Sequence, residues 1–222
     1  MNILLVSATH PEIEPLHGHL KAHWIESSPG LFTKGSCTVR VLITGIGMHR
    51  MGYALGKNIS VFQPELCINA GIAGAFPGKA DIGDVVHVTS ESIVDLGAED
   101  NDGTMLFPDA MGLNEDISSI SELINPAAAD YHFLKPVKGI TVNTVTGSEA
   151  SIAGIVKRWN PDIETMEGGA FFYCCLKEHM PFLEIRAISN LVVPRNVLDW
   201  DIETAVRNLN AQLLEILTFF TG

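Results

Sequence analysis

Cationic residues and cysteines are scarce in this sequence. Its 222 residues include 14 Lys and Arg against 26 Asp and Glu, which gives a formal net charge of −12. A chain without a cationic surplus is a poor partner for nucleic acid or for an anionic membrane surface, and we therefore expect a small-molecule ligand. The cysteines show no C-x-x-C spacing, which predicts reduced and mostly buried thiols. They are Cys37, Cys67, Cys174 and Cys175.

Long apolar runs are also missing, and we expect no secretory leader. Every apolar run is far shorter than the roughly 18 to 20 residues that span a bilayer. The chain passes from Met1 into an apolar segment that ends at Ser7, without the cationic region and cleavage site of a secretory signal. The histidines nearest one another, His17 and His19, do not have the spacing of a metal site, and His10 is more distant. We expect a soluble, cytoplasmic protein that uses no metal and no cofactor.

Apolar runs alternate with segments of helical pattern along the chain. With 46% hydrophobic residues, the chain can bury the core of one sizeable domain. The pattern predicts one α/β domain over residues 1–222, with a central, mostly parallel or mixed twisted sheet flanked by helices on both faces. The polar stretch 92–112 is expected to be a loop. Strands are predicted at 3–7, 39–44, 66–69, 85–89, 137–145 and 182–188, and helices at 11–24, 50–62, 115–124, 152–159 and 201–220.

Ligands of open α/β sheets bind beyond the carboxyl ends of the strands, so the residues that follow the apolar runs are candidates for chemistry. Taken singly, each candidate has an ordinary structural explanation. Acids such as Glu12 and Glu167 are favoured at helix starts. Asn190 can cap or turn the chain, and Gly71 serves a tight turn as well as a close approach to a ligand. The segments concerned are 8–12, 69–74, 164–170 and 186–190.

Two of these segments carry a more specific signal. They are Thr165-Met166-Glu167-Gly168-Gly169-Ala170 and Arg186-Ala187-Ile188-Ser189-Asn190. They resemble the Met-Glu-x-x-Ala and Arg-x-Ile-Ser-Asp/Asn motifs of the purine nucleoside phosphorylase and nucleosidase superfamily, and the similarity covers nearly the whole chain. The resemblance implies a three-layer αβα fold and cleavage of the bond between a purine and ribose. It also implies a homo-oligomer, a dimer or larger, with its pocket near the subunit interface.

The resemblance implies roles for individual residues as well. Glu12 is expected to activate water, Glu167 to hydrogen-bond the ribose hydroxyls, and Asn190 to face the purine edge. Arg195 is the preferred candidate for binding a carboxylate at the far end of the substrate, because a guanidinium binds a carboxylate bidentately. The expected substrate-binding residues are Ile46, Gly71, Ile72, Ala150, Met166, Arg195 and Trp200.

The absence of certain arginines favours water over phosphate as the nucleophile. Phosphorylases of this superfamily typically place arginines after the first strand and before the glycine segment, where they hold the anion. Here segment 8–15 contains no arginine, and residues 67–69, just before the glycines, contain none either. Arg50, supplied by a neighbouring subunit, is the remaining route to phosphorolysis.

Asn190 favours a 6-oxopurine base. An amide donates to O6 and accepts from the N7 hydrogen of the departing base, whereas the aspartate typical of nucleosidases for 6-aminopurines repels O6. Within the superfamily, the full-length resemblance is nearest to the futalosine hydrolases of menaquinone biosynthesis, which release hypoxanthine. The alternatives are a 6-oxopurine nucleoside phosphorylase, a methylthioadenosine or adenosylhomocysteine nucleosidase, and a non-catalytic nucleoside-binding protein.

Overall fold

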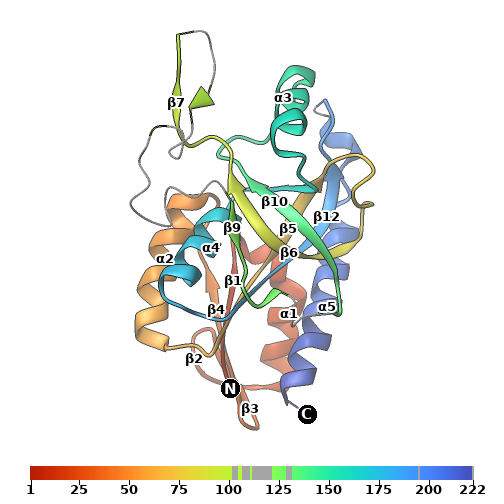
Figure 1. Ribbon diagram of the computed structural model, residues 1–222. Coiled ribbons are helices and arrows are strands. Elements are labelled where there is room, and N and C mark those ends of the chain that lie inside the picture. Colours follow the sequence, from red (N-terminus) through yellow and green to blue (C-terminus); the bar gives the residue numbers. More distant parts are fainter. Residues whose placement is uncertain (102–104, 107–110, 112–121, 129–131, 195, 222) are drawn as a thin grey trace.

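The computed structural model describes residues 1–101, 105–106, 111, 122–128, 132–194 and 196–221 (Figure 1). A mixed β-sheet runs through the molecule, and β7 and β8 form a separate two-stranded sheet. The strands are β1 (Asn2–Ser7), β2 (Ile25–Ser28), β3 (Leu31–Lys34), β4 (Cys37–Ile43), β5 (Leu66–Ala75), β6 (Val85–Ile93), β7 (Ala98–Glu99), β8 (Met105–Leu106), β9 (Leu123–Ile124), β10 (Lys135–Thr141), β11 (Ile163–Thr165) and β12 (Phe182–Leu191).

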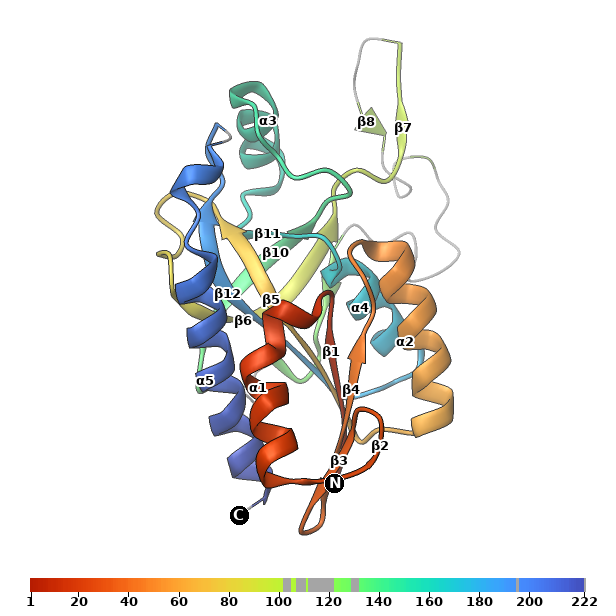
Figure 2. The same ribbon diagram turned by 180° about the vertical axis from the view of Figure 1, so that it is seen from behind.

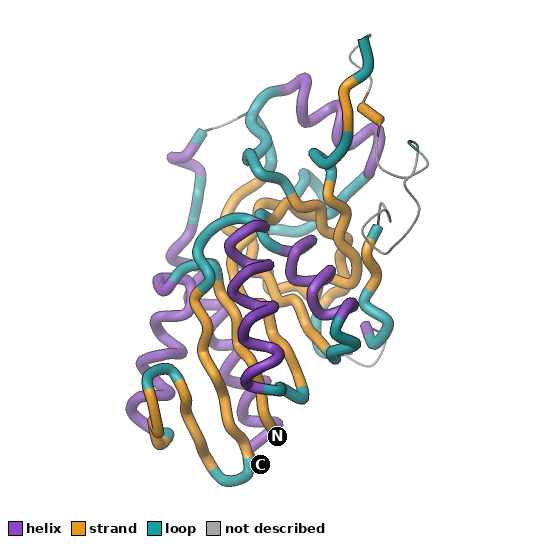
Figure 3. Tube along the Cα trace, turned by 90° about the vertical axis from the view of Figure 1, so that its left-hand side faces the viewer, coloured by secondary structure: helices purple, strands orange, loops and turns teal. Residues whose placement is uncertain are grey.

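The strand pairings make the sheet mixed, and part of it closes on itself. β1 lies between β4 and β5 and is parallel to both, and β12 is parallel to β5 on its other side. β6 is antiparallel to β12 but parallel to β10, which is in turn parallel to β11. Because β11 also pairs with β5, the strands β5, β12, β6, β10 and β11 form a closed ring (Figure 3). The mixed sheet is confirmed, and its closure is a feature that the sequence did not indicate.

Helices cover both faces of the sheet because β1 is apolar on both sides. Ile3 and Leu5 pack in one core cluster with α1 (His10–His23) and α5 (Ile202–Thr221), which lie side by side (Figure 2). Leu4 and Val6 pack in a second cluster with α2 (Met48–Phe62) and α4 (Gly168–Lys177). Successive side chains of a strand point to opposite faces, so a short continuous apolar run is typical of a strand buried on both.

Several of the predicted elements differ from the structure. The stretch 92–112, expected to be a loop, contains the end of β6 and the paired short strands β7 and β8. Leu123 and Ile124 form β9, antiparallel to β6, where a helix over 115–124 was expected, because Leu123 is buried against the sheet. Residues 115–121 of that expected helix lie outside the described residues. The glycine segment 69–74 lies within β5, so the tight turn considered at Gly71 is wrong. Its small residues lie in the closed ring, paired with β12.

The cysteines are reduced and mostly buried, as their spacing predicted. All four cysteines are free, and Cys37, Cys67 and Cys175 are buried while Cys174 is half-buried. Among the described residues, no helix has both the length and the apolar character that crossing a bilayer requires.

Candidate active site

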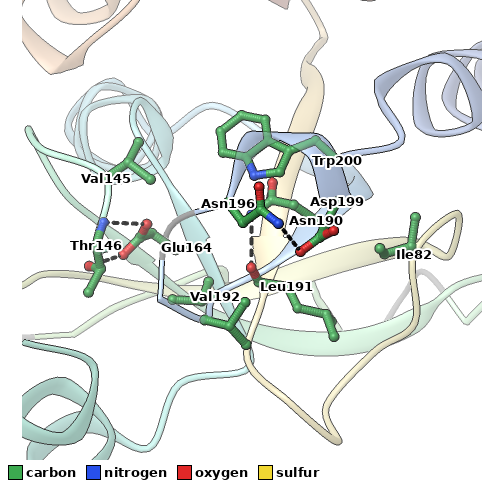
Figure 4. A pocket seen from close by; sticks show the side chains of 11 residues that line it. Ile82, Val145, Thr146, Glu164, Asn190, Leu191, Val192, Asn196, Asp199 and Trp200 are labelled. Carbon is green, nitrogen blue, oxygen red and sulfur yellow. Dashed lines mark hydrogen bonds between the residues drawn. The ribbon is translucent and has the colours of Figure 1, made fainter. Parts of the chain in front are cut away.

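Two adjoining cavities lie beyond the carboxyl ends of β1, β5, β11 and β12. The larger has a volume of about 340 Å³ and the smaller about 260 Å³. Both are lined by Val145, Glu164, Asn190 and Trp200, so these four residues lie where the two cavities adjoin. Figure 4 shows the smaller one, with Asn190 and Trp200 near its centre and Glu164 at one side. The volume of the larger cavity is in the range of small-molecule sites.

Glu12 lines the larger cavity and is held there from several directions. It stands in the first turn of α1, only 8% exposed, where the backbone N–H and the hydroxyl of Thr9 both donate to Oε2 at 2.8 Å. The Ser7 hydroxyl donates to the same oxygen at 3.2 Å, and the Ile72 N–H of β5 donates to Oε1 at 3.1 Å. This capping box fixes the carboxylate at the cavity wall. Donors from the end of β1, from the N-cap Thr9 and from β5 therefore hold the Glu12 carboxylate at the cavity.

Gly71 serves this arrangement by leaving space. A Cβ at Gly71 would collide with Nη1 of Arg186 and lie 2.7 Å from Oε1 of Glu12. Gly71 is not among the residues that line either cavity, and its contact with substrate stays a prediction. Its missing side chain lets the Arg186 guanidinium pass beneath the strand towards Glu12.

Arg186 joins the carboxylates behind the cavity and is a residue to which the sequence reasoning gave no role. It is fully buried, its Nε donates to Oε1 of Glu184 at 2.8 Å, and its Nη2 lies 3.8 Å from Oε2 of Glu167. Burial alone would lower the pKa of Arg186, but Glu184, Glu167 and Glu12 together raise it above its usual value. The guanidinium therefore stays charged and holds the negative side chains together.

Glu167 reaches the larger cavity from the start of α4. The Gly47 N–H, which begins α2, donates to its Oε1 at 2.9 Å. Burial raises the pKa of Glu167, and the charge of Arg186 and the bond from Gly47 oppose that rise. Met166 lines the same cavity beside it, as does Ile46 from the segment before α2. These positions agree with the expectation that residues 166 and 167 face the sugar.

Asn190 lies at the end of β12, between the two cavities. Its Oδ1 accepts from the Ser189 hydroxyl at 2.8 Å, and its Nδ2 donates to the Leu191 carbonyl at 3.2 Å. The pairing of β12 with β5 is irregular between Ile188 and Asn190, which turns the amide towards the cavities. Glu12 and Asn190 thus line one cavity, where a single nucleoside can contact both.

Not every predicted site residue lies at the cavities. Ile46, Ile72, Met166 and Trp200 line the larger cavity, as expected of substrate-binding residues. Ala150 does not: Ser148 caps α3 (Glu149–Trp159), which leaves Ala150 exposed in the first turn, outside both cavities. Arg195 lies outside the described residues.

Other cavity residues were missed. Glu164 carries no motif signal of its own, and Val145 and Thr146, which precede α3, occupy the wall where Ala150 was expected. Glu164 opens the candidate segment 164–170, two residues before the Met-Glu pair, and this position is the signal that could have indicated it.

Comparison with known proteins gives the family. The model of the phosphorylase superfamily matches residues 2–218. The chain belongs to this superfamily.

Curated relatives and solved structures agree with that assignment. A futalosine hydrolase from Thermus thermophilus is 29% identical over 89% of this chain and 91% of its own. A 5'-methylthioadenosine/S-adenosylhomocysteine nucleosidase from Bacillus cytotoxicus is 26% identical over 90% of each chain. The structure of a futalosine hydrolase from Helicobacter pylori matches with a TM-score of 0.76 and 16% identity, covering 97% of this chain and 98% of that one. The likeness to the solved structure confirms the nucleosidase-like αβα fold.

Proposed function

We propose that this protein hydrolyses the N-glycosidic bond of futalosine to release hypoxanthine and dehypoxanthinylfutalosine, a step of menaquinone biosynthesis. The observation that carries the proposal is that Glu12 and Asn190, from opposite ends of the chain, line one cavity. The higher identity to a futalosine hydrolase than to the Bacillus nucleosidase supports the choice of substrate.

Glu12 is the group that we assign to water. Its carboxylate takes a proton from a water molecule as the water oxygen bonds to C1′ of the ribose. The bond from C1′ to the purine nitrogen breaks, and its electron pair goes to the base, which takes a proton from solvent water. Glu12 returns its proton to solvent, so the sum is the addition of one water across the bond. The donors from Ser7, Thr9 and Ile72 leave the carboxylate one orientation, so little reorganisation is needed during the reaction.

Glu167 is assigned to the ribose. A carboxylate that accepts from the sugar hydroxyls binds more strongly as the ring gains oxocarbenium character, which favours the transition state over the bound substrate. Arg186 holds Glu167 from behind, at 3.8 Å. Asn190 is assigned to the base, because its amide complements both O6 and the N7 hydrogen of hypoxanthine.

Phosphate is a poor alternative to water in this hollow. Among the described residues no arginine or lysine lines either cavity. The charge of Arg186 behind the wall is already matched by Glu184 and Glu167, so a phosphate dianion beside Glu12 and Glu167 would meet mainly negative charge. Arg50 is exposed on α2 and packs its side chain beside Gly45.

The test is release of hypoxanthine from futalosine, measured with and without added phosphate. We expect turnover that does not depend on phosphate and that falls about 10² to 10⁴-fold in Glu12→Gln, with substrate affinity largely kept. Glu14→Gln is the matched control, since Glu14 is exposed on the same helix. Turnover like that of the wild type in Glu12→Gln would remove Glu12 from the mechanism.

The same assay separates the alternatives. Strong phosphate dependence identifies a 6-oxopurine nucleoside phosphorylase. Faster release of adenine from methylthioadenosine or adenosylhomocysteine identifies the second candidate, which the 26% identity to the Bacillus nucleosidase favours. Binding without release of any base identifies a non-catalytic nucleoside-binding protein. The homo-oligomer, the cytoplasmic location and the contact of Arg195 with the benzoate carboxylate stay predictions.

A further inference from the structure

A buried acid that the mechanism does not use lies in the wall between the two cavities. Glu164, in β11, is 5% exposed and lines both cavities, as Asn190 does. The Thr146 N–H donates to Oε1 of Glu164 at 3.0 Å, and the Thr146 hydroxyl donates to Oε2 (Figure 4). The two bonds from Thr146, in the segment that precedes α3, therefore fix the Glu164 carboxyl group in place.

The carboxyl of Glu164 has acceptor capacity left over. Each carboxylate oxygen has two lone pairs, and Thr146 engages one on each. Burial raises the pKa of Glu164, while the two bonds from Thr146 favour the ionised form. Burying a carboxylate costs free energy unless its oxygens accept hydrogen bonds. A ligand that donates a hydrogen bond in the cavity would engage the lone pairs that Thr146 leaves open.

The edge of a 6-oxopurine presents the matching group. N7, O6 and N1 follow one another along this edge, and in hypoxanthine N1 carries a hydrogen. With Asn190 on N7 and O6, the next group along the edge is N1–H, a donor. In adenine the same nitrogen is an acceptor, which an ionised carboxylate repels.

We propose that Glu164 accepts the N1–H of the purine and so selects 6-oxopurines over 6-aminopurines. The inference rests on the base-binding part of the proposed function, but it needs neither the benzoate end of futalosine nor the choice of water as nucleophile. It assigns two residues to the base: Asn190 at N7 and O6, and Glu164 at N1.

The test is the affinity of the folded protein for free hypoxanthine and free adenine, measured by calorimetry for the wild type and for Glu164→Gln. We expect the wild type to prefer hypoxanthine and the variant to bind hypoxanthine about tenfold more weakly, because a neutral acceptor replaces a charged one. Adenine affinity should stay the same or rise. Glu149→Gln is the control, because Glu149 is an exposed acid on α3.

A second measurement does not depend on folding of the variant. 1-Methylhypoxanthine, which lacks the N1 hydrogen, should bind wild-type protein at least tenfold more weakly than hypoxanthine. Equal weakening of hypoxanthine and adenine in Glu164→Gln would mean that Glu164 only supports Thr146, and a wild type that prefers adenine or accepts 1-methylhypoxanthine overturns the proposal. If Glu164 selects hypoxanthine but futalosine is not cleaved, only the proposed function fails.

Discussion

Arg186 is the residue through which the acids of the site act together. It is buried, and the charges of Glu184, Glu167 and Glu12 all act on its guanidinium. Within a sequence, an arginine between apolar residues of a strand gives no indication of its partners. Only the folded chain shows that it forms the positive centre of a negative site, since buried charges are kept where they are paired.

Replacing Arg186 by Met should destabilise the protein strongly. The change leaves Glu184 and Glu167 buried without their counter-charge, which typically costs about 3 to 5 kcal/mol when one partner of a buried ion pair is removed. Urea denaturation measures the loss. Arg207→Met is the control, because Arg207 is exposed on α5. Equal stability of Arg186→Met and the wild type would show that the pairing contributes nothing.

Most of the predicted site residues line the larger cavity, and the start of a helix explains why Ala150 does not. Glu167 and Asn190, which motifs indicated, line the larger cavity, and so does Glu12, which was placed by its position after the first strand. Ala150 was placed by its distance from neighbouring segments, and the N-cap at Ser148 turns it to solvent instead. The sequence does not fix the first residue of a helix to better than one or two positions. An error of that size in the start of α3 is enough to place a side chain in the site when it lies outside.

At the scale of elements, α1 contains a break that bears on the site. Ile13 has non-helical φ and ψ of −122° and 15°, and Pro15 follows inside the helix. The amide of Asn210 in α5 fills the break: its Nδ2 donates to the Glu12 carbonyl at 2.8 Å, and its Oδ1 accepts from the Leu16 N–H at 2.9 Å. Those two groups would otherwise bond each other in a regular helix. Asn210 therefore positions the backbone of Glu12.

Replacing Asn210 by Leu should lower kcat more than it raises KM. The change leaves the Glu12 carbonyl and the Leu16 N–H unpaired in a buried place, at about 1 to 3 kcal/mol for each group, and frees the turn that aims the carboxylate. Steady-state kinetics with futalosine and urea denaturation measure the two effects. Gln212→Leu, two residues further along α5, is the matched control. A loss of stability with unchanged kcat would make Asn210 a purely structural residue.

The elements that the sequence indicated well are those with a simple hydrophobic period. The continuous apolar run of β1 and the amphipathic pattern of α5 agree closely with the predicted ranges. The helix α4 was not anticipated, because Gly168 and Gly169 open it and apolar residues follow on every side. The pairing of β11 with β5, which closes the ring, depends on contacts between residues far apart in the chain, and no local pattern encodes it.

At the scale of the whole molecule, a histidine buried in that closed ring makes the free energy of unfolding depend on pH in the acid range. His87 lies in β6, inside the ring, and is 1% exposed. Burial lowers the pKa of His87 to about 4, whereas in the unfolded chain it is about 6.5. Between these values the unfolded chain binds the proton and the folded protein does not. The contribution of His87 is therefore lost as pH falls from about 6.5 towards 4, by up to about 1.4 kcal/mol per pH unit.

The variant His87→Gln isolates this contribution from that of the buried acids. Burial raises the pKa values of Glu91, Glu164 and Glu167, so these groups change stability with pH in the opposite direction. Wild type and variant share them, and only the difference in unfolding free energy between the two proteins reports His87. Urea denaturation at pH 7, 6, 5 and 4 should show the difference shifting in favour of the variant as pH falls. His23→Gln, at an exposed position in α1, should follow the wild type. If the unfolding free energies of wild type and His87→Gln change with pH in parallel, His87 does not contribute to the loss of stability in acid.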